Sequence, residues 1–152
     1  MSRVLIMSAV ALGLVAAASG LAHAVPSVTA AATAGASGLD LDGEGSSGQH
    51  IVKVADLSAS TTGENGFTVS ISSGSLANTD SATSVPFQVT LVADGAAAPS
   101  AANFTIPSGN SYAWVTASSG SAARDLYILY TPAALQDPGA YSASVDLSII
   151  DN

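Results

Sequence analysis

Alternation of apolar and polar residues is the dominant pattern along this chain, and no segment shows a sustained helical period. A period of two is typical of β-strands that bury one face. Residues 126–130 are apolar at every position, which predicts a central strand covered on both faces. The alternating strands are predicted at residues 50–61, 67–71, 85–91, around Phe104 and Ile106, at 112–116 and at 141–149.

Turn-rich polar segments separate these strands, among them the turn at residues 63–66 and a polar connection over residues 72–84. About seven strands with such connections are typical of an all-β, immunoglobulin-like Greek-key β-sandwich. We therefore expect one β-sandwich domain over residues 39–152, with no internal repeat.

The first 24 residues have the organisation of a cleaved signal peptide. Arg3 supplies a small positive start, residues 4–18 are apolar, and Ala22-His23-Ala24 is a small-x-small cleavage site. The apolar stretch is shorter than the roughly 20 residues that span a bilayer. We expect the mature chain to begin at Val25 and to be exported to the periplasm, the cell surface or the medium without membrane insertion.

Removal of this segment leaves Lys53 and Arg124 as the cations of the mature chain, against eleven Asp and Glu residues. The net charge of about −9 that results disfavours nucleic acids and anionic lipids as partners, because both require clustered Lys and Arg. The chain has no cysteine. Packing alone must therefore stabilise a mature chain of about 128 residues, which is enough for one domain.

Residues suited to catalysis are scarce. The chain has no Gly-x-Ser-x-Gly nucleophile elbow and no thiol, and His50 is the one histidine after residue 24. His50 stands at the start of a predicted strand beside a glycine-rich loop, which favours a surface polar residue over a base or a ligand. We expect no catalytic residues and no enzymatic activity.

Asp40, Asp42 and Glu44 form the strongest candidate for a metal site. Carboxylates at alternate positions, with Gly45 at the sixth position, are similar to the first half of a calcium-binding loop. The twelfth position holds Ile51 in place of a bidentate Glu, and Asp and Gly also form ordinary turns. The pattern favours a turn and no cofactor, with a partial calcium site as the alternative.

Tyr112 and Trp114 are two positions apart on one face of a predicted strand. If exposed, such a pair stacks on a sugar ring, whereas in most sandwiches these residues fill the core. We favour the core, and we keep ligand stacking as the alternative.

The last strand follows a turn with a specific sequence. Asp137, Gly139 and Tyr141 form an Asp-x-Gly-x-Tyr motif, which is similar to the tyrosine corner of immunoglobulin-like sandwiches. In those domains one more strand follows the strand that this motif opens, whereas residues 141–150 run almost to the end of this sequence. The missing neighbour predicts an unpaired edge.

The segments LYILYTPAALQ and Gly139-x-Tyr141 with the alternating strand behind it resemble the end of subunits in the spore-coat-protein-U and archaic chaperone-usher pilin group. The resemblance covers roughly residues 124–150. It implies a secreted β-sandwich that receives its last strand from the N-terminal arm of a neighbouring subunit, by strand complementation, with a periplasmic chaperone as a further partner. The edge that accepts this strand would carry Tyr141, Val145, Leu147 and Ile149.

Residues 25–38 leave two interpretations open. They form either a flexible arm that donates a strand to another copy or a related subunit, or an edge strand of this chain's own sandwich. In both cases we expect a structural or adhesive surface subunit, similar to a pilin. The alternative from a different class is a secreted carbohydrate- or calcium-binding module.

Overall fold

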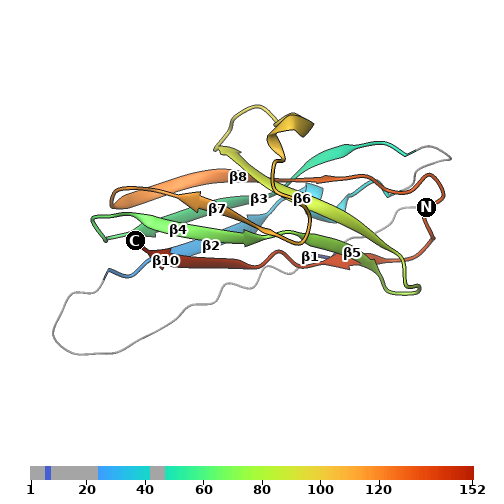
Figure 1. The fold of residues 1–152 in the computed structure, drawn as a ribbon, viewed down its shortest axis with the longest axis horizontal. Helices are drawn as coiled ribbons and strands as arrows, with labels where there is room; N and C mark the ends of the chain where they lie inside the picture. The colour runs from blue at the N-terminus through green and yellow to red at the C-terminus, as the bar shows by residue number, and fades with distance from the viewer. Residues whose placement is uncertain (1–5, 8–23, 42–46) are drawn as a thin grey trace.

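The computed structural model describes residues 6–7, 24–41 and 47–152, and over these ranges the fold is all-β. Figure 1 shows its strands along the long axis of the molecule. The strands are β1 (Ile6–Met7), β2 (Ser27–Ala32), β3 (His50–Thr61), β4 (Phe67–Ser72), β5 (Gly74–Asn78), β6 (Ser84–Ala93), β7 (Ser111–Val115), β8 (Gly120–Tyr130), β9 (Tyr141–Ala143) and β10 (Leu147–Asp151). Two short 3-10 helices, η1 (Ala34–Ser37) and η2 (Ala101–Asn103), lie in the connections.

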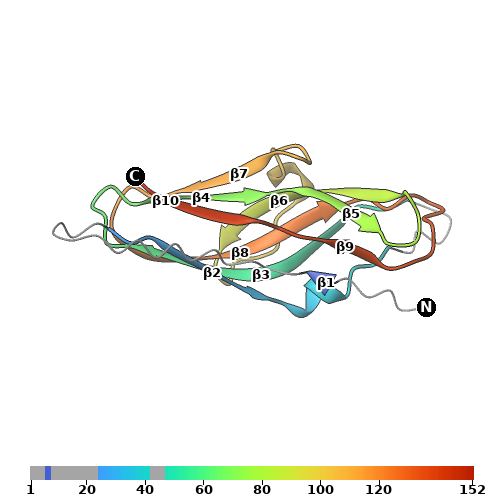
Figure 2. The ribbon, with the colours of Figure 1, turned by 90° about the horizontal axis from the view of Figure 1, so that it is seen from below.

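The described strands form two sheets. The seven-stranded sheet has the order β1-β9-β5-β6-β8-β3-β2, and the three-stranded sheet has the order β10-β4-β7. Every pairing is antiparallel except that of β1 with β9. Figure 2 shows the two sheets stacked, with β4, β7 and β10 on one side and β2, β3 and β8 on the other.

Two long strands belong to both sheets. Residues 67–78 leave the three-stranded sheet as β4 and enter the other sheet as β5, and residues 141–151 do the same as β9 and β10. They remain paired across the change of sheet, because Ser72 N donates to Asp146 O at 3.0 Å and Asp146 N donates to Ser72 Oγ at 2.7 Å. The two sheets are thus joined by a continuous pair of strands.

The main core lies between the sheets. Alternate residues of β4 point inward, as the sequence pattern predicts, and Phe67, Val69 and Ile71 are almost completely buried. They meet inward residues of the other sheet, among them Leu57 and Ile128, in one hydrophobic cluster. Burial of side chains of this size stabilises the fold by roughly 1.5–3 kcal/mol each.

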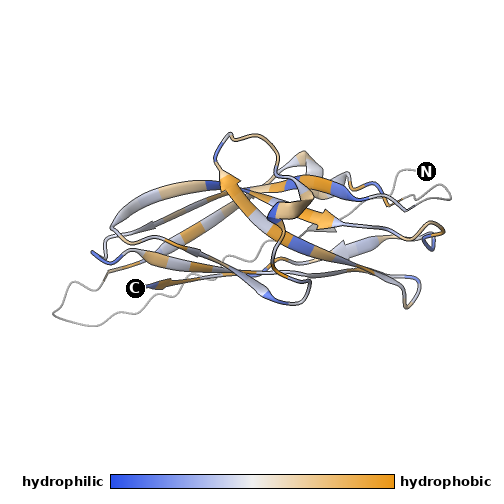
Figure 3. Cartoon of the chain, turned by 45° about the horizontal axis from the view of Figure 1, so that its top comes forward, coloured by the Kyte–Doolittle hydropathy of each residue, from blue (hydrophilic) through white to orange (hydrophobic). Residues whose placement is uncertain are grey.

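The central strand β8 is covered on both faces, which confirms the prediction for residues 126–130. Leu126, Ile128 and Tyr130 face the main core, whereas Tyr127 and Leu129 form a second cluster with Phe104 on the outer face of the sheet. Figure 3 shows hydrophobic residues gathered on the sheet where the segment that carries η2 crosses it.

Side chains of β6 fasten this covering segment. Gln88 Nε2 donates to Phe104 O at 3.3 Å and to Ile106 O at 2.7 Å, and Thr90 Oγ1 donates to Asn103 O at 3.2 Å. The prediction of a strand around Phe104 and Ile106 is therefore wrong. The carbonyl groups of this segment accept hydrogen bonds from side chains of β6 instead of from a neighbouring strand.

Two further boundaries differ from the prediction. The segment 72–84, expected as a polar connection, contains β5, whose single large apolar residue Leu76 is completely buried. The last strand is divided into β9 and β10, because residues 144–146 carry the chain from one sheet to the other. The apolar positions still face the core along its whole length.

Residues 27–32 pair with β3 of the same chain, in register from Ser27 with Ser60 to Ala32 with Ala55. Beyond this strand, Thr33 Oγ1 donates to Lys53 O at 2.6 Å. A side chain at Gly35 would collide with the same carbonyl oxygen, so only glycine allows this close approach. The N-terminal segment therefore lies against its own sheet, and Ala36, Leu39 and Leu41 extend the core.

The covering segment gives a first prediction. Phe104→Ala removes the anchor of the second cluster and lowers the free energy of unfolding by about 3 kcal/mol, since truncation of a buried Phe typically costs about 3–5 kcal/mol. Urea unfolding measures this loss. The adjacent exposed residue provides the control, because Thr105→Ala changes stability by less than about 0.5 kcal/mol. Equal effects of the two substitutions would show that the segment does not pack as described.

Candidate functional site at the C-terminal strand edge

The turn before β9 is held by the hydroxyl group of Tyr141, whose side chain is 1% exposed. The hydroxyl donates to Asp137 O at 2.8 Å and accepts a hydrogen bond from Gln136 Nε2 at 2.7 Å. Burial raises the pKa of Tyr141, but hydrogen bonds from Thr83, Gln136 and Asn78 outweigh it and the pKa lies below its ordinary value. This contact of a buried tyrosine with a backbone carbonyl upstream is the hydrogen bond of a tyrosine corner.

Gly139 and Asn78 complete the turn. Gly139 has a φ of 143°, and a Cβ there would lie 2.6 Å from Asn78 Oδ1. Asn78 Nδ2 in turn donates to Pro138 O at 3.2 Å. The three residues predicted as a structural turn, Asp137, Gly139 and Tyr141, are thus brought together, and they fix where the last strand begins.

From this turn, residues 141–151 run as β9 within the seven-stranded sheet and then as β10 at the edge of the three-stranded sheet. Their inner side pairs with β5 and β4, in register from Asn78 with Tyr141 to Phe67 with Asp151. On the outer side, Ile6 and Met7 pair in parallel with Ser142 and Ala143. Within the described ranges, β10 has no strand hydrogen-bonded to its outer side.

The free edge of β2 faces this edge from the other sheet. β2 is the last strand of the seven-stranded sheet, and it approaches β10 without sharing a hydrogen-bonded ladder with it (Figure 1). We call the line between β2 (Ser27–Ala32) and β10 (Leu147–Asp151) the open seam. Along it, the two sheets meet through side chains alone.

Core residues along the open seam are incompletely covered. Val28 and Ala30 of β2 and Leu147 and Ile149 of β10 pack against the main core but are only half-buried. By contrast, the inward residues of β4 are fully buried. Among the predicted edge residues, Tyr141 and Val145 are buried, and Leu147 and Ile149 form the accessible part of the edge.

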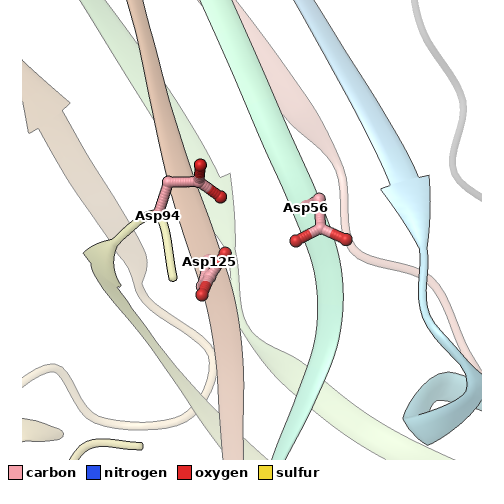
Figure 4. Close-up of side chains that lie close together, drawn as sticks. All are labelled: Asp56, Asp94 and Asp125. Carbon is pink, nitrogen blue, oxygen red and sulfur yellow. The ribbon is translucent and has the colours of Figure 1, made fainter. Parts of the chain in front are cut away.

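Elsewhere, three carboxylates come together on the outer face of the seven-stranded sheet. Asp56 of β3, Asp125 of β8 and Asp94, which follows β6, place carboxylate oxygens within 4.8 Å of one another (Figure 4). Oxygen ligands of this kind suit a hard cation such as calcium. The sequence pattern gives one signal for this cluster, which is a pair of charged residues, Arg124 and Asp125, directly before the apolar run of residues 126–130.

The ammonium group of Lys53 is the cation of this cluster. Lys53 Nζ lies 2.6 Å from Asp56 Oδ1 and 2.9 Å from Asp125 Oδ1, and Gly95 N donates to Asp125 Oδ2 at 3.1 Å. Burial raises the pKa of Asp125, which is 1% exposed, but the bonds from Lys53 and Gly95 outweigh it and hold the pKa below its ordinary 3.8. A β-bulge between Lys53 and Ala55 directs the lysine to this face. We assign the cluster as an ion-paired structural group.

The two aromatic residues predicted for a core or a sugar platform lie on β7 and face inward. Trp114 is 6% exposed and packs edge-on against Phe67 with ring centroids 5.1 Å apart, and the guanidinium of Arg124 lies 5.5 Å from its centroid. Tyr112 is half-buried against the same core. This enclosure of the Trp114 ring favours the core role over stacking on a sugar.

The remaining candidates are the acidic residues of the predicted calcium loop and His50. Asp42 and Glu44 lie outside the described residues, and Asp40 O accepts a hydrogen bond from Tyr130 at 3.2 Å. His50 stacks on Tyr130 with ring centroids 5.2 Å apart at the start of β3. This contact gives the histidine a packing role at the strand entry.

No protein-family model, curated protein or solved structure matches the chain. Among the described residues, no helix has the length and apolar character needed to cross a membrane.

Tyr141→Phe tests the tyrosine corner. The variant loses the hydrogen bond to Asp137 O and leaves the Gln136 amide without its acceptor, so we expect the free energy of unfolding to fall by about 1.5 kcal/mol. Chemical denaturation measures the change. Tyr112→Phe is the control, because the Tyr112 hydroxyl has no hydrogen bond within the described ranges, and it should leave stability nearly unchanged. A corner variant as stable as this control would contradict the assignment.

The ion-paired cluster predicts a specific dependence on pH. The pKa of Asp125 is lowered in the folded state, so its contribution to stability is present above 3.8 and is lost as the pH falls through the folded pKa. Urea midpoints measured between pH 7 and pH 2 should fall below pH 3.8 in the parent protein. Asp125→Asn should be less stable at pH 7 and should fall less steeply in the acid range. Parallel curves for the two proteins would refute this role.

Proposed function

We propose that this protein is an exported, non-enzymatic structural or adhesive surface subunit, similar to a pilin, which assembles by accepting a β-strand along the open seam. The supporting observation is that two strand edges, which have no partner among the described residues, coincide with a line of half-buried core residues. An added strand would pair with the backbone of β10 and would cover Leu147 and Ile149. Strand addition supplies affinity through main-chain hydrogen bonds and specificity through alternate side chains.

The position of the open seam supports this proposal. In an immunoglobulin-like sandwich, the strand that follows the tyrosine corner is paired on one side with an earlier strand and on the other with the final strand. Here β10 has β4 on one side, and its other side is the unpaired edge. A strand added along the open seam would therefore take the position that the final strand has in an immunoglobulin-like sandwich.

The pairing of β1 with β9 also supports it. Ile6 and Met7 add to the outer edge of β9 in parallel, at Ser142 and Ala143. β1 lies within the expected signal peptide, so a mature chain that begins at Val25 would present this edge of β9 to a further strand. The chain has no cysteine and few charged residues, and its described residues form no assembled catalytic group. These features are consistent with a structural role.

In a single chain, the approach of β2 to β10 closes the core without backbone pairing. An incoming strand would separate these two strands and would replace a contact between side chains by ladders of backbone hydrogen bonds. Each such bond contributes about 0.5–1.5 kcal/mol net. A strand of several residues therefore offsets the loss of the β2–β10 contact.

A pair of neighbouring substitutions tests the proposal. Ile149→Lys places a charge on the half-buried side of β10, facing the core, whereas Ile150→Lys places the same charge on the opposite face, where Ile150 is 63% exposed. We expect the first variant to abolish assembly and the second to leave it intact. Size-exclusion chromatography and electron microscopy of the exported protein measure assembly, and circular dichroism confirms that both variants are folded.

A parent protein that stays monomeric at all concentrations, alone and with its exported partners, would overturn the proposal. Equal assembly by both variants would overturn the assignment of the open seam as the interface.

A further inference from the structure

We infer that the strand that fills the open seam belongs to a different protein and not to a second copy of this chain. This strand carries Lys or Arg beside an alternating apolar stretch. The inference rests on the proposed function and adds the chemistry of the partner. Three features of the structure carry it: the charges around the seam, the commitment of β2 to its own sheet, and the small side chains that line the seam.

The rim of the open seam is acidic. Asp146 and Asp151 lie on the last strand itself, and both are exposed. Glu64 lies in the turn that precedes β4, and the neighbouring Gly63 approaches the carboxylate of Asp151.

The two cations of the chain beyond residue 24 do not neutralise this rim. Lys53 is held by Asp56 and Asp125 on the outer face of the larger sheet, and Arg124 lies over the ring of Trp114. β2, which forms the opposite side of the seam, has no charged residue. The rim therefore attracts a strand with flanking cations and repels one with flanking carboxylates.

A second copy is a poor source of the strand. Its residues 25–38 contain no cation, and the rest of its surface has the same negative charge. Its Ser27–Ala32 are already paired with β3, and Ser27 Oγ lies 2.9 Å from Ser60 Oγ. Donation of this strand would break one ladder to form another, so the exchange gains little backbone pairing.

The side chains along the seam set a second requirement. Ala30 is small, and Leu147 and Ile149 opposite β2 are incompletely covered. A strand that lies along β10 must supply bulky apolar residues at alternate positions to complete the packing. Residues 25–36 offer only Val25 and Val28 among many alanines. A partner strand rich in Val, Ile or Leu meets the requirement.

Three synthetic peptides test the inference on the exported protein. The first alternates Val and Thr and has Lys at both ends, the second has the same centre with Glu at both ends, and the third has the sequence of residues 25–36. Binding is measured by the rise in unfolding temperature and by the protection from hydrogen exchange of the Leu147 amide, which points away from β4 because the alternate residues Asp146 and Asn152 form the hydrogen-bonded pairs with that strand. Ile149→Lys serves as the variant in which the site is blocked.

We expect the Lys-flanked peptide to bind at least about tenfold more tightly than the Glu-flanked peptide at low salt, with a smaller ratio at high salt because exposed charges are screened. Asp146→Lys should reduce this ratio, and Ile149→Lys should abolish binding. The peptide of residues 25–36 should bind most weakly of the three, since it has neither cations nor bulky residues.

Different outcomes separate the inference from the proposed function. Binding of the 25–36 peptide as tightly as the Lys-flanked one would identify a second copy as the partner, which overturns the inference and leaves the proposed function standing. Equal binding of the Lys- and Glu-flanked peptides would overturn the charge requirement alone. Failure of every peptide to bind a protein that also never assembles would overturn both.

Discussion

The antiparallel pairing of residues 67–78 with residues 141–151 is the constraint on which the structure depends. These two strands cross from one sheet to the other together, so their ladder sets how the sheets are stacked. Hydrogen bonds between Ser72 and Asp146 maintain the pairing at the crossing. The same arrangement leaves the outer side of the last strand without a partner on β10, since each strand can pair on two sides and β4 occupies one of them.

The tyrosine corner sets the start of this pairing, and the sequence motif was sufficient to predict it. Tyr141, Gly139 and Asp137 are close in the chain, and a buried tyrosine with a glycine turn has few alternative geometries. Strands with clear alternation, such as 50–61 and 67–71, were predicted for the same reason. Turns and alternating strands can be predicted from the sequence because residues close together in the chain determine them.

Long-range contacts explain what the pattern did not predict. β5 has a single large apolar residue, and it becomes a strand because the edge of β6 pairs with it. The segment around Phe104 has alternating apolar residues but lies as a cover on β8, held by Gln88 and Thr90. The ion-paired cluster of Lys53 with Asp56, Asp94 and Asp125 joins residues from three distant segments. The partners in each of these contacts are far apart in the chain, so no single stretch of sequence identifies them together.

The ladder between the two long strands also determines how the molecule would carry a mechanical load. Its strands run along the long axis of the molecule (Figure 1), so a pull on the C-terminal residues along that axis stresses the hydrogen bonds of β10 with β4 in shear. Bonds loaded in shear share the force and must break together, whereas bonds loaded one after another open like a zipper. A strand added along the same edge would lie in the same direction and would transmit tension from one molecule to the next by the stronger of these two modes.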